Sequence, residues 1–256
     1  MVNTSMEIKY LHEQNTSVKK NTNFSILSWT EEYRPNPPIL DGNLRSGIVT
    51  VTYDMRKYSD VGSTKNFDGS QNSFWATYSM ERSDKRLFHS DFQFTRYAGT
   101  MNFHILTFSS GALDGFLRCG YSSDRLPPQR IFDLFGSTAD LSSPGSLRTI
   151  RFKEFAGDRF VSLQFEHNFG SLPFRALGIS FMNNKDFILF TGSAWSDLSA
   201  ESRAIQPVPL RTCRSVLNEV GFGLGRLFTF FRIDFAWRLS GNTKNDFAIT
   251  LGSPMW

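Results

Sequence analysis

Residue types that could carry catalysis are sparse in this chain of 256 residues. A serine, cysteine or water nucleophile needs a histidine and an acid close by. The chain has four histidines, and none of them lies in a recognisable nucleophile motif: His12, His89, His104 and His167. Its two cysteines, Cys119 and Cys213, are too few for a disulfide framework or a cysteine-built zinc site. The sequence therefore predicts a protein that is not an enzyme, with no catalytic residue, no metal site and no cofactor.

Charged side chains gather instead in the stretch from Leu147 to Phe169. Its first half is loop-like and contains Arg148, Arg151, Lys153, Glu154, Asp158 and Arg159. Its second half alternates strictly, with Val161, Leu163, Phe165, His167 and Phe169 on one face and Ser162, Gln164, Glu166 and Asn168 on the other. A strand with one apolar face and one uncharged-polar or acidic face suits a wall between lipid and water. We therefore expect a charged loop that leads into a lipid-facing strand.

The composition points to the same environment. Aromatic residues make up 15% of the chain and include 26 phenylalanines, which is more than a soluble core usually needs. Mean hydropathy is nevertheless −0.29, and no window approaches the apolar run of about 18 residues that a membrane helix requires. Transmembrane barrels combine high aromatic content with low hydropathy because every second residue of a strand faces the lumen.

Alternating segments recur along the whole chain, and we expect eleven strands. Six precede the charged loop, at Met6–Gln14, Asn23–Tyr33, Ser46–Tyr58, Phe74–Arg82, Asp91–Tyr97 and Thr100–Phe108. Five follow it, at Val161–Phe169, Asp186–Trp195 with a backward extension through Ile179 and Phe181, Glu219–Phe228, Phe231–Leu239 and Asp246–Leu251. A long extracellular loop at about residues 109–158 separates the two groups. Such long connections are usually functional or disordered.

The segment Phe231–Leu239 bears on the choice between two all-β architectures. Its apolar residues face one way, and Arg232, Asp234 and Arg238 face the other way. Alternation alone also fits a soluble sandwich. The aromatic apolar faces, the alternation of long and short connections and the near absence of helical periodicity favour an antiparallel transmembrane β-barrel.

Net charge gives little support to nucleic-acid binding. The chain carries a formal charge of +4 and its pI is near 9.1, but Lys and Arg are scattered and often neighbour acids, as in the segment 81–86, ERSDKR. We expect lipid, and no nucleic acid, as the partner of this surface.

Three segments carry a resemblance to a known family: Ser146-Leu147-Arg148, then Phe155-Ala156-Gly157-Asp158-Arg159, then Ser162 to Phe169. Together with Gly221–Gly225 and Phe231–Leu239, they resemble the barrel of the BamA-like outer-membrane assembly and two-partner-secretion superfamily (bacterial surface antigen barrel). The resemblance is to the branch whose full-length members carry an N-terminal carboxypeptidase-regulatory-like domain, and it extends from about Thr100 to the C-terminus.

The resemblance implies a fold, a place and a role. Barrels of this family have sixteen strands, and their sixth extracellular loop folds into the lumen ahead of the last five. Residues 1–256 would then form a single, incomplete C-terminal barrel domain without a periplasmic domain. The missing strands would come from upstream of Met1 or from a partner chain. The expected place is the cell outer membrane, and the expected role is non-enzymatic insertion or translocation of client outer-membrane or secreted proteins.

The resemblance also implies a lock between loop and lumen. Arg148 matches the family's loop arginine and Glu166 matches the acid on the following strand. Thr149 replaces the family's glycine, and Phe190 stands where a second acid is expected, so that either the lock uses one acid or Asp234 substitutes. Guanidinium binds carboxylate bidentately, and partial desolvation strengthens such a pair. Arg232 and Arg238 are the expected lumen charges, which compensate Asp234.

Several alternatives stay open from sequence. Arg148 is equally well explained as a solvated loop arginine, because surface pairs contribute little. A passive pore or a small standalone barrel competes with the assembly role, and an outer-membrane hydrolase is a third possibility. The chain begins without the apolar region of a signal peptide, which argues against export unless it is a fragment. Cys119 and Cys213, expected in extracellular loops, form either one disulfide or two thiols.

Overall fold

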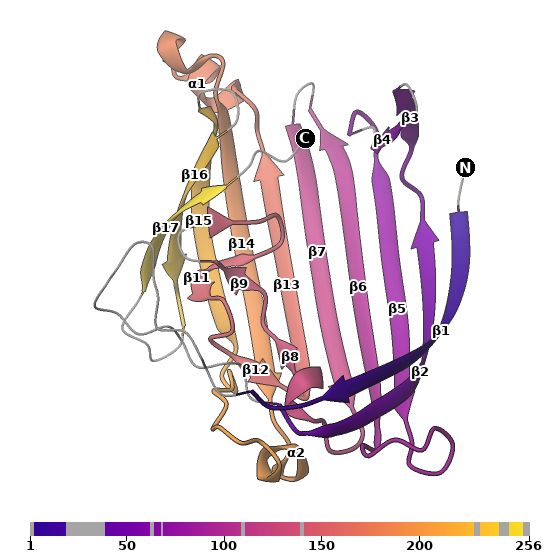
Figure 1. Cartoon of the computed structure of the whole chain (residues 1–256). Coiled ribbons are helices and arrows are strands. Elements are labelled where there is room, and N and C mark those ends of the chain that lie inside the picture. The colour runs from indigo at the N-terminus through magenta and orange to yellow at the C-terminus, as the bar shows by residue number, and fades with distance from the viewer. Residues whose placement is uncertain are drawn as a thin grey trace.

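The protein is all-β, as predicted, and most of its strands belong to one large curved sheet (Figure 1). It is described here from a computed structural model, in which residues 3–18, 39–61, 64–67, 69–108, 111–138, 141–227, 231–240 and 246–252 are placed. No helix among these residues is long and apolar enough to span a membrane.

The large sheet has eleven strands in the order β1-β2-β5-β6-β7-β13-β14-β15-β16-β17-β10. Ten of them form an antiparallel run: β1 (Asn3–Asn15), β2 (Gly42–Asp54), β5 (Ser73–Ser83), β6 (Phe94–Thr107), β7 (Gly111–Ser122), β13 (Arg159–Asn168), β14 (Asp186–Asp197), β15 (Leu217–Leu227), β16 (Phe231–Arg238) and β17 (Phe247–Gly252). The eleventh, β10 (Leu141–Ser142), is short and pairs with β17 in parallel. The sheet is open among the described residues, because β1 pairs only with β2 and no ladder joins it to β17 or β10.

The described residues of the stretch 123–158, which we call the returning segment, lie against the concave face of this sheet (Figure 1). The segment contains η1 (Pro128–Arg130), β8 (Phe132–Asp133), β9 (Gly136–Ser137), β10, β11 (Leu147–Arg151) and β12 (Ala156–Gly157). Two small ladders hold it together, since β11 pairs with β9 and β12 with β8. Outside the sheet lie the hairpin β3 (Tyr58–Val61) and β4 (Thr64–Phe67), and the short helices α1 (Leu172–Ala176), η2 (Ser180–Met182) and α2 (Ala200–Ala204).

An apolar core fills the space between the returning segment and the sheet. From the segment it takes Leu126, Phe132, Leu134, Leu147, Ile150 and Phe155. From the inward positions of the sheet it takes Leu44, Phe94, Phe160, Ala194 and Leu217. Burial of the leucine, isoleucine and phenylalanine side chains of this core, each contributing about 1.5–3 kcal/mol, holds the segment in place.

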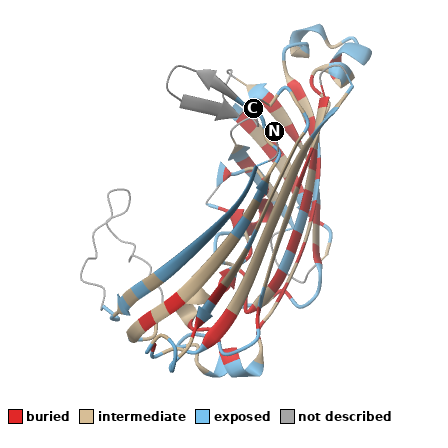
Figure 2. Cartoon of the chain, turned by 90° about the vertical axis from the view of Figure 1, so that its right-hand side faces the viewer, coloured by how far each residue is buried: buried red, intermediate tan, exposed pale blue. Residues whose placement is uncertain are grey.

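In a soluble sheet the apolar face is buried and the polar face is exposed, and on the strands β13 and β16 of this sheet the reverse holds. Along β13 the polar side chains Ser162, Gln164 and Glu166 are buried, whereas Val161 and Leu163 are 44% and 37% exposed. The same holds along β16, where Arg232, Asp234 and Arg238 are buried and Phe231 and Trp237 are exposed. Figure 2 shows this alternation of buried and exposed residues along the strands. The outward positions at the centres of the described strands carry no Asp, Glu, Lys or Arg.

Three details of the predicted strands are wrong. Asp91–Tyr97 and Thr100–Phe108 form one strand, β6, since the chain runs extended through Ala98-Gly99. The predicted loop at 109–158 begins with another full strand, β7, so the returning segment starts only at residue 123. Ile179 and Phe181 lie at η2 and do not extend β14. The predicted strand at Asn23–Tyr33 lies outside the described residues.

Candidate charged lock on the concave face

Arg148 is positioned by strand β11 of the returning segment. Its neighbours Leu147 and Ile150 are fully buried in the core, and Leu147 lies above Gly192, where any side chain would collide with it. The backbone between these two anchors leaves Arg148 only 3% exposed, with its guanidinium directed at the sheet. The solvated-arginine interpretation of Arg148 is therefore wrong.

Two arginines and two carboxylates form a closed ring at this point. Arg148 binds Glu166 Oε1 through Nη2, and its Nε lies 3.2 Å from Asp234 Oδ2. On the other side Arg232 Nη1 lies 2.6 Å from Glu166 Oε2, and Arg232 Nε lies 2.5 Å from Asp234 Oδ1. Each carboxylate thus offers one oxygen to each arginine, and the ring is neutral. Neutrality, and an opposite charge on both sides of each group, are what allow four charged groups to be buried, although Arg232 Nη2 has no hydrogen-bond partner among the described residues.

Phe190 stacks on the ring. The guanidinium carbon of Arg148 lies 4.3 Å from the centroid of the phenyl ring, and that of Arg232 lies 5.8 Å from it. A cation over an aromatic face is attracted by the ring quadrupole. Phe190 therefore contacts the same arginines from the position where an acid was expected, and Asp234 is the second carboxylate of the lock.

Glu219 holds the backbone of the returning segment, a role that sequence reasoning missed. Its carboxylate accepts hydrogen bonds from the backbone N–H of Arg148 and of Thr149, both at 3.0 Å, and from the Thr149 hydroxyl at 2.7 Å. Arg238 lies outside the ring and donates to the Thr149 carbonyl. Threonine at position 149 thus supplies a contact that glycine would lack.

Opposing effects act on the pKa of Arg148. Burial alone disfavours the charged guanidinium and lowers its pKa, but the negative charges of Glu166, Asp234 and Glu219 outweigh this effect. The pKa of Arg148 is raised above its ordinary value, and the side chain stays charged.

A second ionic anchor holds the start of the returning segment. Arg130 Nε lies 3.1 Å from Glu81 on β5, and its Nη2 lies 2.9 Å from Glu13 on β1. Arg96 on β6 lies 3.9 Å from Glu81 and stacks 4.1 Å from the centroid of Phe132. Arg130 lies in a Pro-rich stretch without strand periodicity, so its partners could not be read from the sequence.

Histidines and cysteines are dispersed, and no group of three or more His, Cys, Asp or Glu side chains fit to hold a metal occurs in the described part of the chain. His104 contacts Asp114 at 2.7 Å and His167 contacts the Thr107 hydroxyl at 2.7 Å, but neither of these two histidines has both an acid and a hydroxyl as hydrogen-bond partners among the described residues. Cys119 and Cys213 are both free thiols. Cys119 lies on β7 and not in a loop, and Cys213 is buried in the core.

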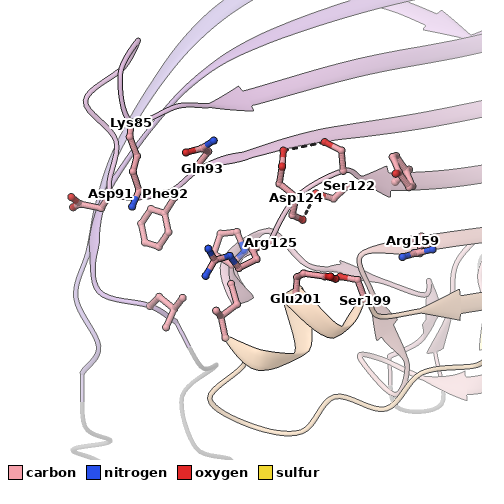
Figure 3. A pocket seen from close by; sticks show the side chains of 15 residues that line it. Lys85, Asp91, Phe92, Gln93, Ser122, Asp124, Arg125, Arg159, Ser199 and Glu201 are labelled. Atoms are coloured by element: carbon pink, nitrogen blue, oxygen red, sulfur yellow. Dashed lines mark hydrogen bonds between the residues drawn. The ribbon is translucent and has the colours of Figure 1, made fainter.

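A polar cleft of about 610 Å³ lies where the returning segment leaves the sheet, and we call it the rim cleft (Figure 3). Its lining carries charges of both signs, namely Lys85, Arg125 and Arg159 with Asp91, Asp124 and Glu201. Because basic and acidic side chains are equal in number, the lining favours neither anions nor cations. It also lacks a histidine that could act as the base for a nucleophile.

Comparison with known proteins adds no relative to this description. No protein-family model matches the chain, and no curated protein is significantly similar to it. The fold and the site together define a protein with an open, curved antiparallel sheet. The outer face of the sheet is apolar, and buried charges hold the returning segment to its inner face.

Proposed function

We propose that the chain is the C-terminal part of an outer-membrane β-barrel, with its convex face against lipid and its concave face toward an aqueous interior. One observation carries this proposal: at the centres of β13 and β16 the large apolar side chains point outward and are partly or wholly exposed, whereas the charged side chains point inward and are buried. In water this arrangement would leave apolar side chains exposed across the outer face, whereas soluble monomers rarely expose large contiguous apolar patches. In lipid it is the stable orientation.

Aromatic residues near one end of the strands support the same orientation. Tyr97 and Tyr121 stack across β6 and β7 with ring centroids 6.4 Å apart. Trp195 on β14 and Trp237 on β16 lie toward the same end as Tyr121 on β7. These three strands run in the same direction, and each of the three residues lies near the C-terminal end of its strand. Tyrosine and tryptophan gather where one end of the side chain is apolar and the other is wet.

An open sheet in lipid needs a partner at its free edge. β1 presents a 13-residue edge whose backbone groups are paired with β2 on one side only, and an unpaired backbone group in hydrocarbon costs several kcal/mol. Figure 2 shows β1 exposed along most of its length. Within the proposal, further strands from upstream sequence or from a partner chain pair with β1 and complete the wall.

The returning segment favours a closed interior over a passive pore. It packs on the concave face and is held by two ionic anchors and an apolar core. The BamA-like resemblance implies a role in the insertion or translocation of client proteins. This role is compatible with a returning segment that is held to the inner face by ion pairs, which can separate. Catalysis has no comparable support, since among the described residues His167 contacts a hydroxyl without an acid on its other side, and His104 contacts an acid without a nucleophile.

Membrane insertion is tested by refolding the chain with lipid vesicles and floating them through a density gradient after an alkaline wash. The proposal expects the chain to float with the vesicles and to resist extraction. A control with Val161, Leu163 and Phe165 all changed to Ser should stay at the bottom of the gradient, because it places polar groups at the centre of the outer face. Extraction of the unaltered chain by the alkaline wash would contradict the proposal.

A further inference from the structure

The outward face of the sheet contains one apolar hollow of about 460 Å³. It spans β5, β6, β7, β13 and β14, and seven outward side chains line it: Tyr78, Tyr97, Cys119, Tyr121, Arg159, Val161 and Trp195. The hollow arises because two small residues, Gly99 and Cys119, are paired across β6 and β7 between large outward side chains of the lining, such as Tyr97, Tyr121 and Trp195. A Cβ on Gly99 would come within 3.1 Å of Cys119 Sγ, so the sulfur atom forms the floor.

Arg159 lies at the end of this hollow, and its guanidinium is not fully paired with acids of the described residues. Its side chain is 42% exposed, and its Nε lies 3.6 Å from Asp158 Oδ1. The Asp158 carboxylate is already engaged by the backbone N–H and the hydroxyl of Ser199. The other nearby acid, Asp197, is paired with Arg214 at 2.8 Å. Within the described residues the terminal nitrogens of Arg159 therefore have no hydrogen-bond acceptor.

The same arginine belongs to both the apolar hollow and the rim cleft. Figure 3 shows Arg159 beside Ser199 and Glu201, on the far side of the cleft from Lys85 and Asp91. A molecule that crosses this boundary would meet, in order, an apolar hollow, a free guanidinium and a cleft that contains the carboxylates of Glu201 and Asp124. That order of apolar, cationic and anionic groups is complementary to an acyl chain, a phosphate and an ammonium group.

We propose that the hollow binds one acyl chain of a zwitterionic aminophospholipid, whose phosphate is held by Arg159 and whose ammonium faces Glu201 and Asp124. The local charges argue for a zwitterion. Asp158, Asp197, Arg159 and Arg214 sum to zero, so an extra negative charge alone would lack a counter-charge. The phenols of Tyr97 and Tyr121 lie at the same boundary and make no hydrogen bond to any described residue, so they are free to donate to the phosphate. This inference rests on the proposed membrane insertion.

The test uses the 256-residue chain refolded in a non-ionic detergent and mixed with equal amounts of phosphatidylethanolamine, phosphatidylglycerol and diacylglycerol. Native mass spectrometry then measures which lipid stays bound. We expect phosphatidylethanolamine to be retained in preference to the other two lipids. Arg159→Gln should lower its affinity about tenfold, the effect of losing one hydrogen bond to a charged group. Val161→Trp, which fills the hollow without touching the charge, should lower retention as well.

Arg82→Gln is the matched control, since Arg82 is another outward arginine at a strand end, on β5, and does not line the hollow. Equal retention of diacylglycerol, preferential retention of phosphatidylglycerol, or equal losses from Arg159→Gln and Arg82→Gln would each overturn the inference. Vesicle flotation of the same variants separates this failure from failure of the proposed function. If the chain floats but shows no lipid preference, only the lipid-binding inference is contradicted. If the chain does not float, both this inference and the proposed membrane insertion are contradicted.

Discussion

At the scale of single residues, the lock depends on complementary charges that have no exposure to water. Arg148, Arg232, Glu166 and Asp234 are each 3% exposed or less, and every carboxylate oxygen in the ring contacts a guanidinium nitrogen. Buried ion pairs add little net stability when they form, because desolvation offsets their attraction. Removal of one member is a different matter, since it leaves an unpaired charge in a site that water does not reach.

Arg148→Ala should therefore release the returning segment. The variant leaves the ring with two carboxylates and one arginine, a change that costs about 3–5 kcal/mol at a buried site. Limited proteolysis of the refolded chain should show cleavage between residues 123 and 158 that the unaltered chain resists. Arg151→Ala is the control, because Arg151 lies on the same strand and is exposed. Equal cleavage of the two variants would contradict the lock.

Which of these residues could be read from the sequence depends on their surroundings. Arg148, Glu166 and Asp234 could be predicted from the sequence, because they occupy positions that the resemblance singles out or that face inward on a strictly alternating strand. Glu219 gave no such signal, since β15 contains Gly221, Gly223 and Gly225 and its alternation is weak. Its role depends on the approach of the returning segment from 70 residues away, which no local pattern records.

At the scale of elements, regular alternation predicted strands well and glycine obscured them. β13 and β16 alternate without interruption and were predicted close to their observed bounds. In β6, Ala98-Gly99 resembled a turn, but Gly99 lies within the strand opposite Cys119. In β7, three glycines and an aspartate hid the alternation. These glycines serve packing, as at Gly115, where a Cβ would lie 2.2 Å from the Phe103 ring.

Gly221 on β15 offers a direct test of close packing under the lock. A Cβ at this position would lie 2.3 Å from the Phe190 ring and 2.3 Å from the carbonyl oxygen of Phe235, which is backbone and cannot rotate away. Gly221→Ala should lower the free energy of unfolding by about 1–3 kcal/mol, the usual cost of overpacking. Urea titration in detergent measures it. Gly225→Ala, whose Cβ would meet no atom closer than 3.2 Å, should cost less, and equal losses would contradict the account.

Arg130 tests the second anchor, at the start of the returning segment. Arg130→Ala removes the ion pairs to Glu81 and Glu13, which connect η1 to β5 and to β1. Hydrogen exchange should become faster for the amides of residues 124–134, while those of Leu147–Arg151 stay protected by the lock. Faster exchange throughout the segment would show that the two anchors act as one.

At the scale of the whole molecule, the sheet is a wall with two chemically distinct faces and a free edge. Its outer face is apolar, its inner face carries the charges, and the returning segment covers part of the inner face (Figures 1 and 2). The all-β class, the five strands after the returning segment and the polarity of the faces followed from residue alternation. The family resemblance, and not alternation, implied an in-folded loop and missing strands. The start of the returning segment at residue 123 and its anchor at Arg130 depend on contacts between distant residues and emerged only from the structure.

If lipid surrounds this wall, the amides of β1 must find partners. Hydrogen exchange of the membrane-inserted chain should show Asn3–Asn15 protected on the edge that is free in the structure, because lipid offers no acceptor or donor. Cross-linking would then identify the neighbour as a second copy or another chain. Rapid exchange along β1 in the inserted chain would contradict pairing at this edge.

The most direct test of the lipid-facing wall compares tryptophans on its two faces. Trp195 and Trp237 point outward, whereas Trp75 points inward toward the Arg56 guanidinium, 5.2 Å from its ring. Single-tryptophan variants, with the other tryptophans changed to Phe, are refolded into vesicles of brominated phospholipid. A variant with Phe74→Trp and Trp75→Phe moves the probe one residue along β5, to the outer face at the same height.

We expect strong quenching by bromine for tryptophan at positions 74, 195 and 237, and weak quenching at position 75. Equal quenching at positions 74 and 75, or no quenching at any outward position, would contradict a lipid-facing convex surface.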